Sequence, residues 1–482
     1  MVDFRPVAYV IGRILIVLAI LMLGPAVIDW RAGLENGVAF LSSAAITGVV
    51  GGALTLATGN ALGRSLDTRQ AYLLTASIWA VVPFFGALPF YIGAPGLSFQ
   101  NAYFEAVSGI TTTGASVIPG LADLPAGLNL WRGMLNWLGG LGIAIIAMIF
   151  LPLMRIGGMQ FFRTEGFDTF GKALPRAADI ARQLLVVYAM LTVLIMVVYS
   201  ILGMPAIEAV VHGMTTVATG GFSTNDDSFS SYGRAIHYAA AIFMFLASLP
   251  FIRYVQLVNG ASGPLWHDVQ VRAYFRWLMT AVLMATAYRI LTSGALWETA
   301  FRESLFNLTS IMSSTGFGAG SFAAWGPFVL VVSYVLGVIG ACSGSTAAGL
   351  SVFRVQVAFA ALSREVRRIG SPSSVDPIRY DGRAVDDDVL NALILFVSSF
   401  ILILGLMSVA MTLLGVDAVS ALFAVWTTLG NVGYGFGPLV ERTGTFIDFP
   451  PGAIAIMTLC MILGRLGLLA ILVLVLPSFW RR

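Results

Sequence analysis

A short glycine loop that follows an apolar segment recurs four times along this chain. Its central glycines, as the sequence aligns them, are Gly114, Gly220, Gly316 and Gly433, separated by 106, 96 and 117 residues. One such loop alone is an ordinary turn. Four unrelated loops would have to reproduce a regular spacing as well as a composition, so the pattern predicts a fourfold internal repeat of about one hundred residues.

The last loop indicates what such a repeat does. Asn431-Val432-Gly433-Tyr434-Gly435 differs at one position from the T-V-G-Y-G sequence whose carbonyl oxygens replace the water around K⁺ in tetrameric channels. We therefore expect three residues of each loop to line an ion filter that binds K⁺. They are Thr112, Thr113 and Gly114; Ala218, Thr219 and Gly220; Ser314, Thr315 and Gly316; Asn431, Val432 and Gly433.

Each loop is preceded by a short, largely apolar segment that is long enough for about three helical turns. Polar or acidic residues stand in or near the start of these segments, namely Asn101 and Glu105, Glu208, Glu303 and Asp417. Carboxylates in the first turn of a helix interact favourably with its dipole. We therefore expect four pore helices.

The chain is 58% hydrophobic and 11% charged, which is outside the range of soluble proteins. A membrane-spanning helix needs about 20 mainly apolar residues. Ten such runs occur, near 8–29, 36–62, 71–93, 128–153, 183–203, 235–258, 273–294, 325–359, 390–414 and 452–477. The first two precede any glycine loop, and the other eight bracket the four loops.

These runs predict an all-α integral membrane protein with four membrane-pore-membrane repeats around a pseudo-fourfold pore. A loop at membrane depth is tolerated where protein buries it or where it lines water, and four loops on one axis meet that condition. We expect an N-terminal two-helix extension over 1–66 and repeats over 67–160, 161–260, 261–370 and 371–482.

Basic residues set the orientation, because positive charge accumulates on the cytoplasmic side. With the N-terminus inside, six of the 27 Lys and Arg residues lie outside, and these are Arg31, Arg132, Arg234, Arg289, Arg302 and Arg442. We therefore expect both termini in the cytoplasm and all four loops opening outward. Asp123, Asp226 and Asp227 lie near the loops, either as a charge that attracts cations or as ordinary solvated loop residues.

The run 325–359 is too long for one straight crossing and is rich in small residues after Gly337. Because glycine weakens a helix by about 1 kcal/mol relative to alanine, we expect two half-helices joined by a loop that gates the pore. Close packing of small residues against a neighbouring helix is the alternative. The expected gating residues are Gly340, Ser343, Gly344, Ser345, Thr346 and Gly349.

Arg465 is the basic residue that we place deep inside a span. A charge in mid-membrane costs about 2.5–3.5 kcal/mol on insertion scales and faces a cavity or a partner. We interpret Arg465 as a positive barrier in the ion path, with a structural pair to an anion as the alternative.

Other function classes fit less well. The chain contains no G-x-x-x-x-G-K-[ST] phosphate loop, and Cys342 and Cys460 lie in separate apolar runs. His212, His237 and His267 are scattered, so no catalytic constellation, and hence no enzyme, is predicted. A secondary transporter with inverted repeats is an alternative, but these repeats all begin on the same side.

On its motifs the chain resembles the Trk/Ktr potassium-uptake family, TrkH-type membrane subunit, over nearly its whole length. The residues that carry the resemblance are Phe104–Gly109 with Thr111–Ala115, Ala218–Thr224, Ser314–Phe317, Gly344–Ala347 and Gly464–Leu466. The helix pair ahead of four membrane-pore-membrane repeats also resembles that type.

The resemblance implies potassium uptake by a homodimer in the bacterial inner membrane, with one ion path per subunit. It also implies a separate cytosolic regulatory subunit of the TrkA type, which binds nucleotide. We expect potassium as the transported ion, and no organic cofactor or nucleic-acid partner. A sodium-conducting or Na/K-cotransporting relative is the alternative; some such relatives carry serine in the first loop, where this chain has Gly114.

Overall fold

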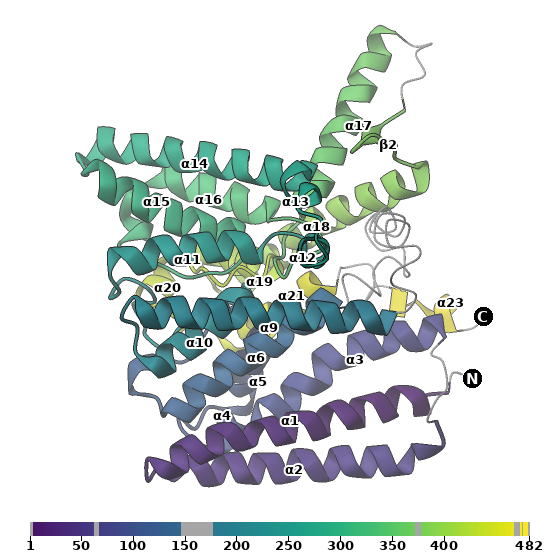
Figure 1. Cartoon of the computed structure of the whole chain (residues 1–482), viewed down its shortest axis with the longest axis vertical. Helices are drawn as coiled ribbons and strands as arrows, with labels where there is room; N and C mark the ends of the chain where they lie inside the picture. The colour runs from purple at the N-terminus through teal and green to yellow at the C-terminus, as the bar shows by residue number, and fades with distance from the viewer. Residues whose placement is uncertain are drawn as a thin grey trace.

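The computed structural model of the chain describes residues 3–61, 67–145, 177–371, 377–466, 473–474 and 476–480. Within these residues the regular secondary structure is almost all helix, as predicted, and the strands are the two-residue segments β1 (Arg379–Tyr380) and β2 (Arg383–Ala384), which pair antiparallel. Figure 1 shows most helices running side by side, with α17 (Val352–Gly370) standing out from the body.

The N-terminal extension consists of α1 (Arg5–Arg31) and α2 (Asn36–Ala57), followed by the turn η1 (Gly59–Ala61). The two helices approach closely at Gly12, where a Cβ atom would lie 2.8 Å from the Gly51 carbonyl oxygen. The buried Asp29 carboxylate accepts hydrogen bonds from Asn36 Nδ2 (2.6 Å) and from the Gly127 amide at the start of α6 (2.7 Å). Asp29 therefore ties the helix pair to the first repeat.

Four copies of one element order follow: a membrane helix, a pore helix, a glycine loop and a second membrane helix. Repeat 1 has α3 (Thr68–Gly86), α4 (Leu88–Ile92), α5 (Phe99–Ile110), η2 (Leu121–Asp123) and α6 (Ala126–Ile145). Repeat 2 has α9 (Ala177–Ile201), α10 (Ala206–Val217), α11 (Arg234–Ala247) and α12 (Phe251–Val258), and α13 (Gly263–His267) links it to repeat 3. Repeat 3 has α14 (Val269–Ser293), α15 (Trp297–Met312), η4 (Phe322–Trp325), α16 (Pro327–Ile339) and α17. Repeat 4 has α18 (Asp387–Leu413), α19 (Ala418–Leu429), α20 (Pro438–Glu441) and α21 (Pro451–Leu466), and α23 (Pro477–Trp480) ends the described chain.

Two expected spans are broken. The break expected in 325–359 is confirmed, since α16 ends at Ile339 and α17 begins at Val352. The span expected as one helix over 235–258 is instead two, because α11 and α12 meet at an angle of 92°. Pro250 precedes α12 there, and proline supplies no amide to continue a helix. Residues 146–153 and most of 467–477 lie outside the described residues.

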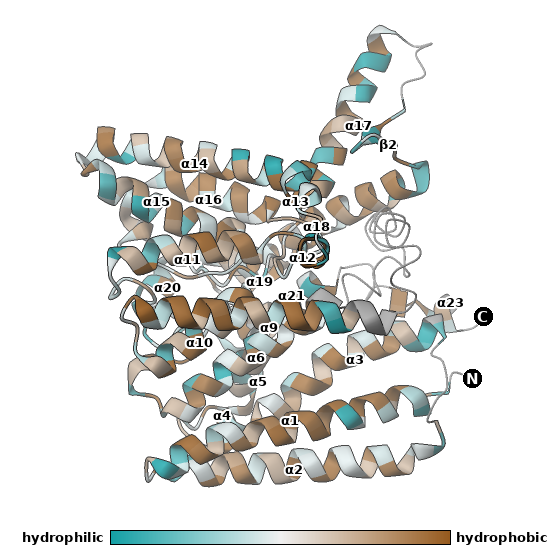
Figure 2. Ribbon diagram, viewed as in Figure 1, coloured by the Kyte–Doolittle hydropathy of each residue, from teal (hydrophilic) through white to brown (hydrophobic). Residues whose placement is uncertain are grey.

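Five of the described helices are long and apolar enough to cross a membrane alone, with α3 and α4 counted as one. Figure 2 shows that α9 is hydrophobic along much of its length, and its residues Val193, Val197 and Ile201 are exposed. A soluble monomer rarely exposes large apolar patches, so these exposed side chains are typical of helices that cross a membrane.

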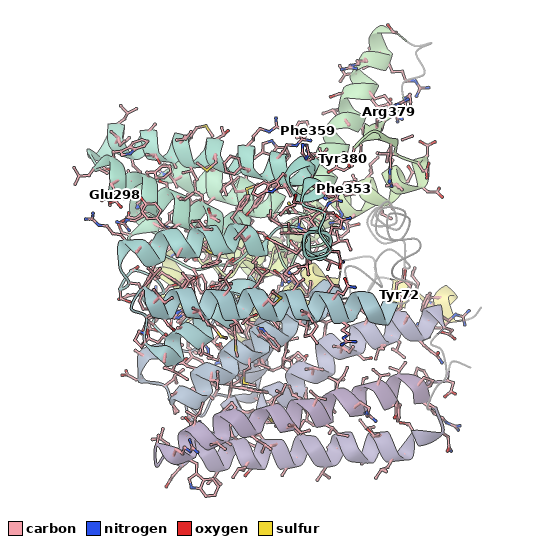
Figure 3. The ribbon with its side chains drawn as sticks, viewed as in Figure 1. Tyr72, Glu298, Phe353, Phe359, Arg379 and Tyr380 are labelled. Carbon is pink, nitrogen blue, oxygen red and sulfur yellow. The ribbon has the colours of Figure 1, made fainter. Side chains whose placement is uncertain are left out.

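One end of the molecule carries α17 and the β1–β2 pair, and Glu298 lies at the opposite end (Figure 3). The Tyr380 ring packs edge-on against Phe353 of α17, with centroids 4.9 Å apart. At the same end Tyr72 of α3 contacts Phe479 of α23. The start of α1 lies at this end too (Figure 1).

Candidate functional site

All four pore helices end in the same turn. In the first, the Thr112 amide donates to the Gly109 carbonyl and the Thr113 amide to the Ser108 carbonyl, both at 2.9 Å. The same two bonds recur in the other loops, from Thr219 and Gly220, from Ser314 and Thr315, and from Asn431 and Val432, at 2.8–3.3 Å. Such paired bonds form the Schellman motif that ends many helices. The residues of the four turns therefore correspond one to one.

The first residue of each turn has left-handed backbone angles although none is glycine. The φ values are +52° for Thr112, +48° for Thr219, +58° for Ser314 and +48° for Asn431. This position usually holds glycine, and a side chain there costs on the order of 1 kcal/mol. Four side chains held at this cost indicate that the side chains themselves have a role.

The third residue of each turn is a glycine with positive φ, and these four glycines close a ring. A Cβ atom on Gly114 would lie 2.3 Å from the carbonyl oxygen of Gly220 in the next repeat, and one on Gly221 would lie 1.8 Å from that of Thr315. Gly316 meets Val432 in the same way, and Gly433 meets Thr113, both at 2.1 Å. Each repeat thus abuts the next, and the fourth abuts the first, around one axis.

This geometry corrects the alignment of the second loop by one residue. The expected central glycine was Gly220, but the left-handed glycine is Gly221, with φ +71°. Gly220 occupies the place of Thr113, Thr315 and Val432, and Ala218 is the last residue before the turn. Gly220 is glycine for another reason: a Cβ there would lie 2.6 Å from the Asn136 amide of α6.

A cavity of about 420 Å³ opens above the ring and is lined by Gly114, Gly221, Gly316 and Gly433. Of the three aspartates noted near the loops, Asp226 and Asp227 line this cavity. Asp226 accepts hydrogen bonds from the Gly120 and Leu121 amides at 3.1–3.2 Å, so it also joins two loops. Glu441 adds a further carboxylate to the wall.

The comparisons with known proteins agree with this architecture. The sequence model of the TrkH family, described as cation transport protein, matches residues 36–482. The chain is 35% identical to the Trk system potassium uptake protein TrkI of Halomonas elongata, over 99% of this chain and 97% of that protein. It is 33% identical to TrkH of Escherichia coli, over 99% and 100%. The structure superposes on the crystal structure of the potassium transporter TrkH from Vibrio parahaemolyticus with a TM-score of 0.92 and 30% sequence identity. This match covers 100% of each chain.

The chain belongs to the TrkH family. The resemblance stated from its motifs is thereby confirmed, as is the fold of four membrane-pore-membrane repeats with an N-terminal helix pair. The relatives are named as transporters, and the chain is a membrane transport protein and not an enzyme.

In this TrkH-family chain the break between α16 and α17 is a compact loop with touching ends. The Leu350 and Ser351 amides donate to the Val338 and Ile339 carbonyls at 3.0 and 2.8 Å. A Cβ on Gly340 would overlap the Ala348 carbonyl oxygen, which explains a glycine with φ +69° at that end. The residues between, Ala341 to Gly349, form an Ω-like loop. We call Gly340 to Gly349 the intramembrane loop.

Repeat 2 holds the far side of the intramembrane loop. The Phe251 amide, the first of α12, donates to the Gly344 carbonyl at 2.9 Å. Thr346 Oγ1 lies 3.2 Å from the carbonyl oxygens of both Val217 and Ala247. From repeat 3, Gln270 Oε1 accepts the Ser343 amide at 2.9 Å. The bend between α11 and α12 therefore supplies a partner for a loop that would otherwise leave polar backbone in an apolar layer.

Two of the four strained side chains contact this loop directly. Thr219 Oγ1 lies 3.2 Å from Thr346 Oγ1, and the Ala348 amide donates to Ser314 Oγ at 3.1 Å. Arg465 links a third, Thr112, to the loop, since its Nη2 donates to Thr112 Oγ1 at 2.7 Å and also to the Thr346 carbonyl. The fourth, Asn431, donates instead to Thr113 Oγ1 and to the Met461 carbonyl. The intramembrane loop thus sits against the glycine ring.

Sequence reasoning missed several residues of this site. Gly221 was hidden beside Gly220, since two adjacent glycines leave the register open. Glu105, read as a pore-helix residue, forms a buried ion pair with Arg132 of α6 (Oε1 to Nε, 2.9 Å). Arg132 had been placed among the outside charges, although only 1% of its side chain is exposed. A charge within an apolar run was the signal available for Arg132.

Proposed function

We propose that this TrkH-family chain carries potassium into the bacterial cell across the inner membrane, through a filter formed by its four glycine loops. The supporting observation is the closed ring, in which each left-handed glycine abuts a carbonyl of the next repeat. Carbonyl rings replace the hydration shell of K⁺. In loops 1, 3 and 4 the filter residues are those expected from the sequence, and in loop 2 they are Thr219, Gly220 and Gly221, one residue later than expected.

Glycine at all four abutting positions favours potassium over the sodium-conducting alternative. A side chain at any of them would push a neighbouring carbonyl out of the ring, since no Cβ fits there. The named potassium-uptake relatives point the same way. Asp226, Asp227 and Glu441 in the outer cavity raise the local concentration of cations.

The gate in this proposal is the intramembrane loop with Arg465. Opening the path beneath the ring requires that the loop leave Thr219 and Ser314, and that Arg465 leave Thr112 or Thr346. The guanidinium is always charged, so it repels a cation in the path. The contacts also give a route by which loop movement reaches the filter backbone.

The assembly in this proposal is a homodimer in the lipid bilayer with both termini in the cytoplasm. A cytosolic TrkA-type nucleotide-binding subunit then drives the loop. The end that carries α17, α23 and the start of α1 faces the cytoplasm, and the outer cavity faces away from it. Arg364, Arg367 and Arg368 of α17 lie at that end, as the positive-inside rule requires.

The test of the filter is transport by purified protein in liposomes, with rubidium as tracer for potassium and with sodium as competitor. Replacing Gly316 by serine should lower the preference for rubidium over sodium while the protein still purifies as before. Unchanged selectivity after serine replacement at all of Gly114, Gly221, Gly316 and Gly433 would remove the filter proposal.

A further inference from the structure

The residue nine positions before each abutting glycine lies on a pore helix behind the filter. In repeats 1 to 4 these residues are Glu105, His212, Asn307 and Ala424. The first three are polar and buried, with exposed fractions of 0%. A buried polar group is stabilising only if it is hydrogen-bonded, so the bonds of these three side chains show what each one holds.

Glu105 holds the segment of loop 1 that follows Gly114. Its carboxylate accepts hydrogen bonds from Ser116 Oγ (3.0 and 3.1 Å) and from the Val117 amide (3.0 Å), which are two and three residues after Gly114. Arg132 neutralises the carboxylate and donates from Nη1 to the Ser223 carbonyl of loop 2 at 2.7 Å. The pair therefore braces one loop and links it to the next.

His212 holds the equivalent residue of loop 2. Its Nδ1 lies 2.9 Å from the Glu208 carbonyl, which only accepts, so Nδ1 carries the proton. Nε2 then accepts from Ser223 Oγ at 3.1 Å. Ser223 stands two residues after Gly221, as Ser116 stands after Gly114. Each of these serines also accepts the amide two residues on, from Asn225 and from Ile118, at 3.1 Å.

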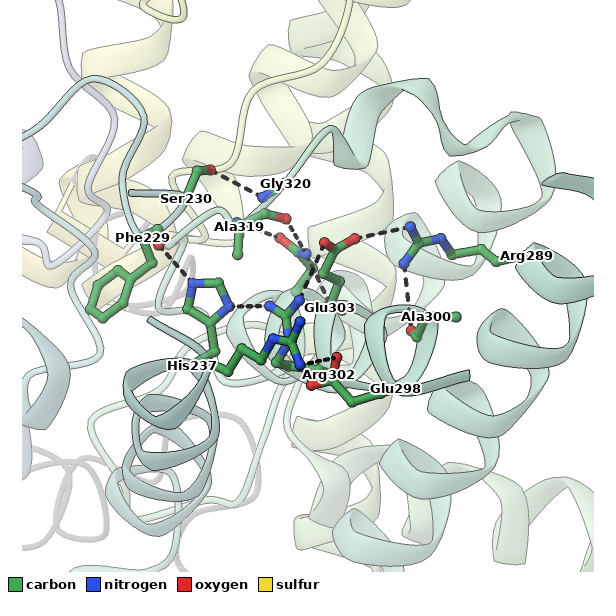
Figure 4. Close-up of polar contacts among 12 residues, drawn as sticks. Phe229, Ser230, His237, Arg289, Glu298, Ala300, Arg302, Glu303, Ala319 and Gly320 are labelled. Atoms are coloured by element: carbon green, nitrogen blue, oxygen red, sulfur yellow. Dashed lines mark hydrogen bonds and ion pairs between the residues drawn. The ribbon is translucent and has the colours of Figure 1, made fainter. Parts of the chain in front are cut away.

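Asn307 holds loop 3 by its backbone. Its Nδ2 donates to the Ala319 carbonyl at 2.8 Å, and its Oδ1 accepts the Ala319 amide at 3.1 Å. Figure 4 shows the surrounding support, in which the Gly320 amide donates to Ser230 Oγ and His237 donates to the Phe229 carbonyl. Ala319 is three residues after Gly316, as Val117 is after Gly114.

Loop 4 is braced by different chemistry. Its pore helix carries Ala424 at the equivalent position, and the residue three after Gly433 is Phe436. The Phe436 ring packs against Phe423, Trp426 and Tyr434, with centroids 5.0–6.2 Å apart. Among the described residues, the loop segments that follow the abutting glycines are thus held by polar pore-helix side chains in three repeats and by an aromatic cluster in the fourth.

We propose that Glu105, His212 and Asn307 are positioning residues that set the ion selectivity of the filter from behind. Each fixes the part of a glycine loop that lies two or three residues beyond the abutting glycine. Movement there would change the spacing of the carbonyl oxygens of the filter. None of the three needs to touch the ion. This inference rests on the proposed function, because it assigns a cause to the selectivity of that same ring.

The experiment measures rubidium and sodium uptake by reconstituted protein carrying Asn307→Leu, which keeps the branched shape of the side chain and removes both bonds to Ala319. Selectivity for rubidium over sodium should fall by up to about tenfold, the factor reached when the whole energy of one buried hydrogen bond contributes to discrimination between the two ions. The yield of folded dimer should stay within the range of the parent. Ser304→Ala is the matched control, because Ser304 is buried on the same helix and its hydroxyl has no partner among the described residues.

A double-mutant cycle tests repeat 2 with milder changes. If His212 acts through Ser223, then Ser223→Ala, His212→Leu and the double variant should all lose selectivity by a similar factor. Selectivity at the parental value in Asn307→Leu and Ser223→Ala would overturn the positioning role. If those two variants keep the parental selectivity while Gly316→Ser loses it, the positioning role is rejected and the filter proposal stands. If Gly316→Ser also keeps the parental selectivity, the filter proposal fails and the positioning role fails with it.

Discussion

Gly221 faces the carbonyl oxygen of Thr315 so closely that a Cβ atom on the glycine would lie 1.8 Å from that oxygen. The neighbouring Gly220 faces a side chain instead, the amide of Asn136. Two adjacent glycines are therefore required for two different reasons. One meets backbone that cannot move without deforming the ring, and the other meets a single side chain that substitution can remove.

This difference gives the first prediction. Gly220→Ala should impair uptake because its methyl group overlaps Asn136, and Asn136→Ala should restore uptake in the double variant. Gly221→Ala should impair uptake equally, since both φ and the Thr315 carbonyl oppose a side chain. Asn136→Ala should not rescue it. The measurement is potassium-dependent growth of an uptake-deficient strain, with membrane protein quantified in parallel; rescue of both variants would contradict the assignment.

The fold was predictable because the membrane leaves few choices. Apolar runs of about 20 residues must be helices in lipid, and the fourfold spacing of glycine loops then fixes their order. The break in the run 325–359 was predictable for a different reason, since clustered glycines weaken a helix. The bend at Pro250 was not predicted. The hydropathy of 235–258 is continuous, and the partner that stabilises the bend is the Gly344 carbonyl, far away in sequence.

The site was predictable at the level of loops but not of side-chain partners. The four turns share backbone hydrogen bonds, and glycine marks the third residue in each. In repeat 2 the second residue is also glycine, so sequence spacing alone cannot choose between Gly220 and Gly221. The links from Thr112 to Arg465 and from Thr219 to Thr346 join residues 353 and 127 positions apart. Only the folded chain brings such residues together.

The second prediction concerns the strained turn residue Ser314. Ser314→Gly relieves a left-handed angle, worth on the order of 1 kcal/mol, and removes the hydroxyl that accepts the Ala348 amide. The variant should conduct faster than the parent without losing thermal stability. Asp381→Gly is the control, since Asp381 has φ +48° in the exposed turn between β1 and β2. Equal flux in Ser314→Gly and the parent would show that this contact does not hold the loop closed.

The third prediction concerns the intramembrane loop. Deletion of Ser343 to Ala347 removes its contacts with Thr219, Gln270 and Phe251. Because the ends of the loop already lie together, a shorter connection between Cys342 and Ala348 is compatible with α16 and α17 staying in place. Flux through reconstituted protein should rise. A fall in flux by a variant that still purifies as the parental oligomer would mean that the loop supports the path and does not close it.

The last prediction concerns Arg465, whose described partners are a hydroxyl and a carbonyl oxygen, both neutral. At an effective dielectric constant near 20, a cation about 8 Å from the guanidinium meets a repulsion of roughly 2 kcal/mol. A tenfold change in rate needs about 1.4 kcal/mol, so the charge slows permeation without abolishing it. Arg465→Ala should therefore raise potassium flux by about tenfold or more, whereas Arg465→Lys, which keeps the charge, should stay closer to the parent. Initial rates of potassium uptake into liposomes with matched protein content distinguish the effect of Arg465→Ala from that of Arg465→Lys. If Arg465→Ala remains a monodisperse oligomer and conducts no faster, then the guanidinium serves only to join Thr112 to Thr346, and the barrier must be the intramembrane loop itself.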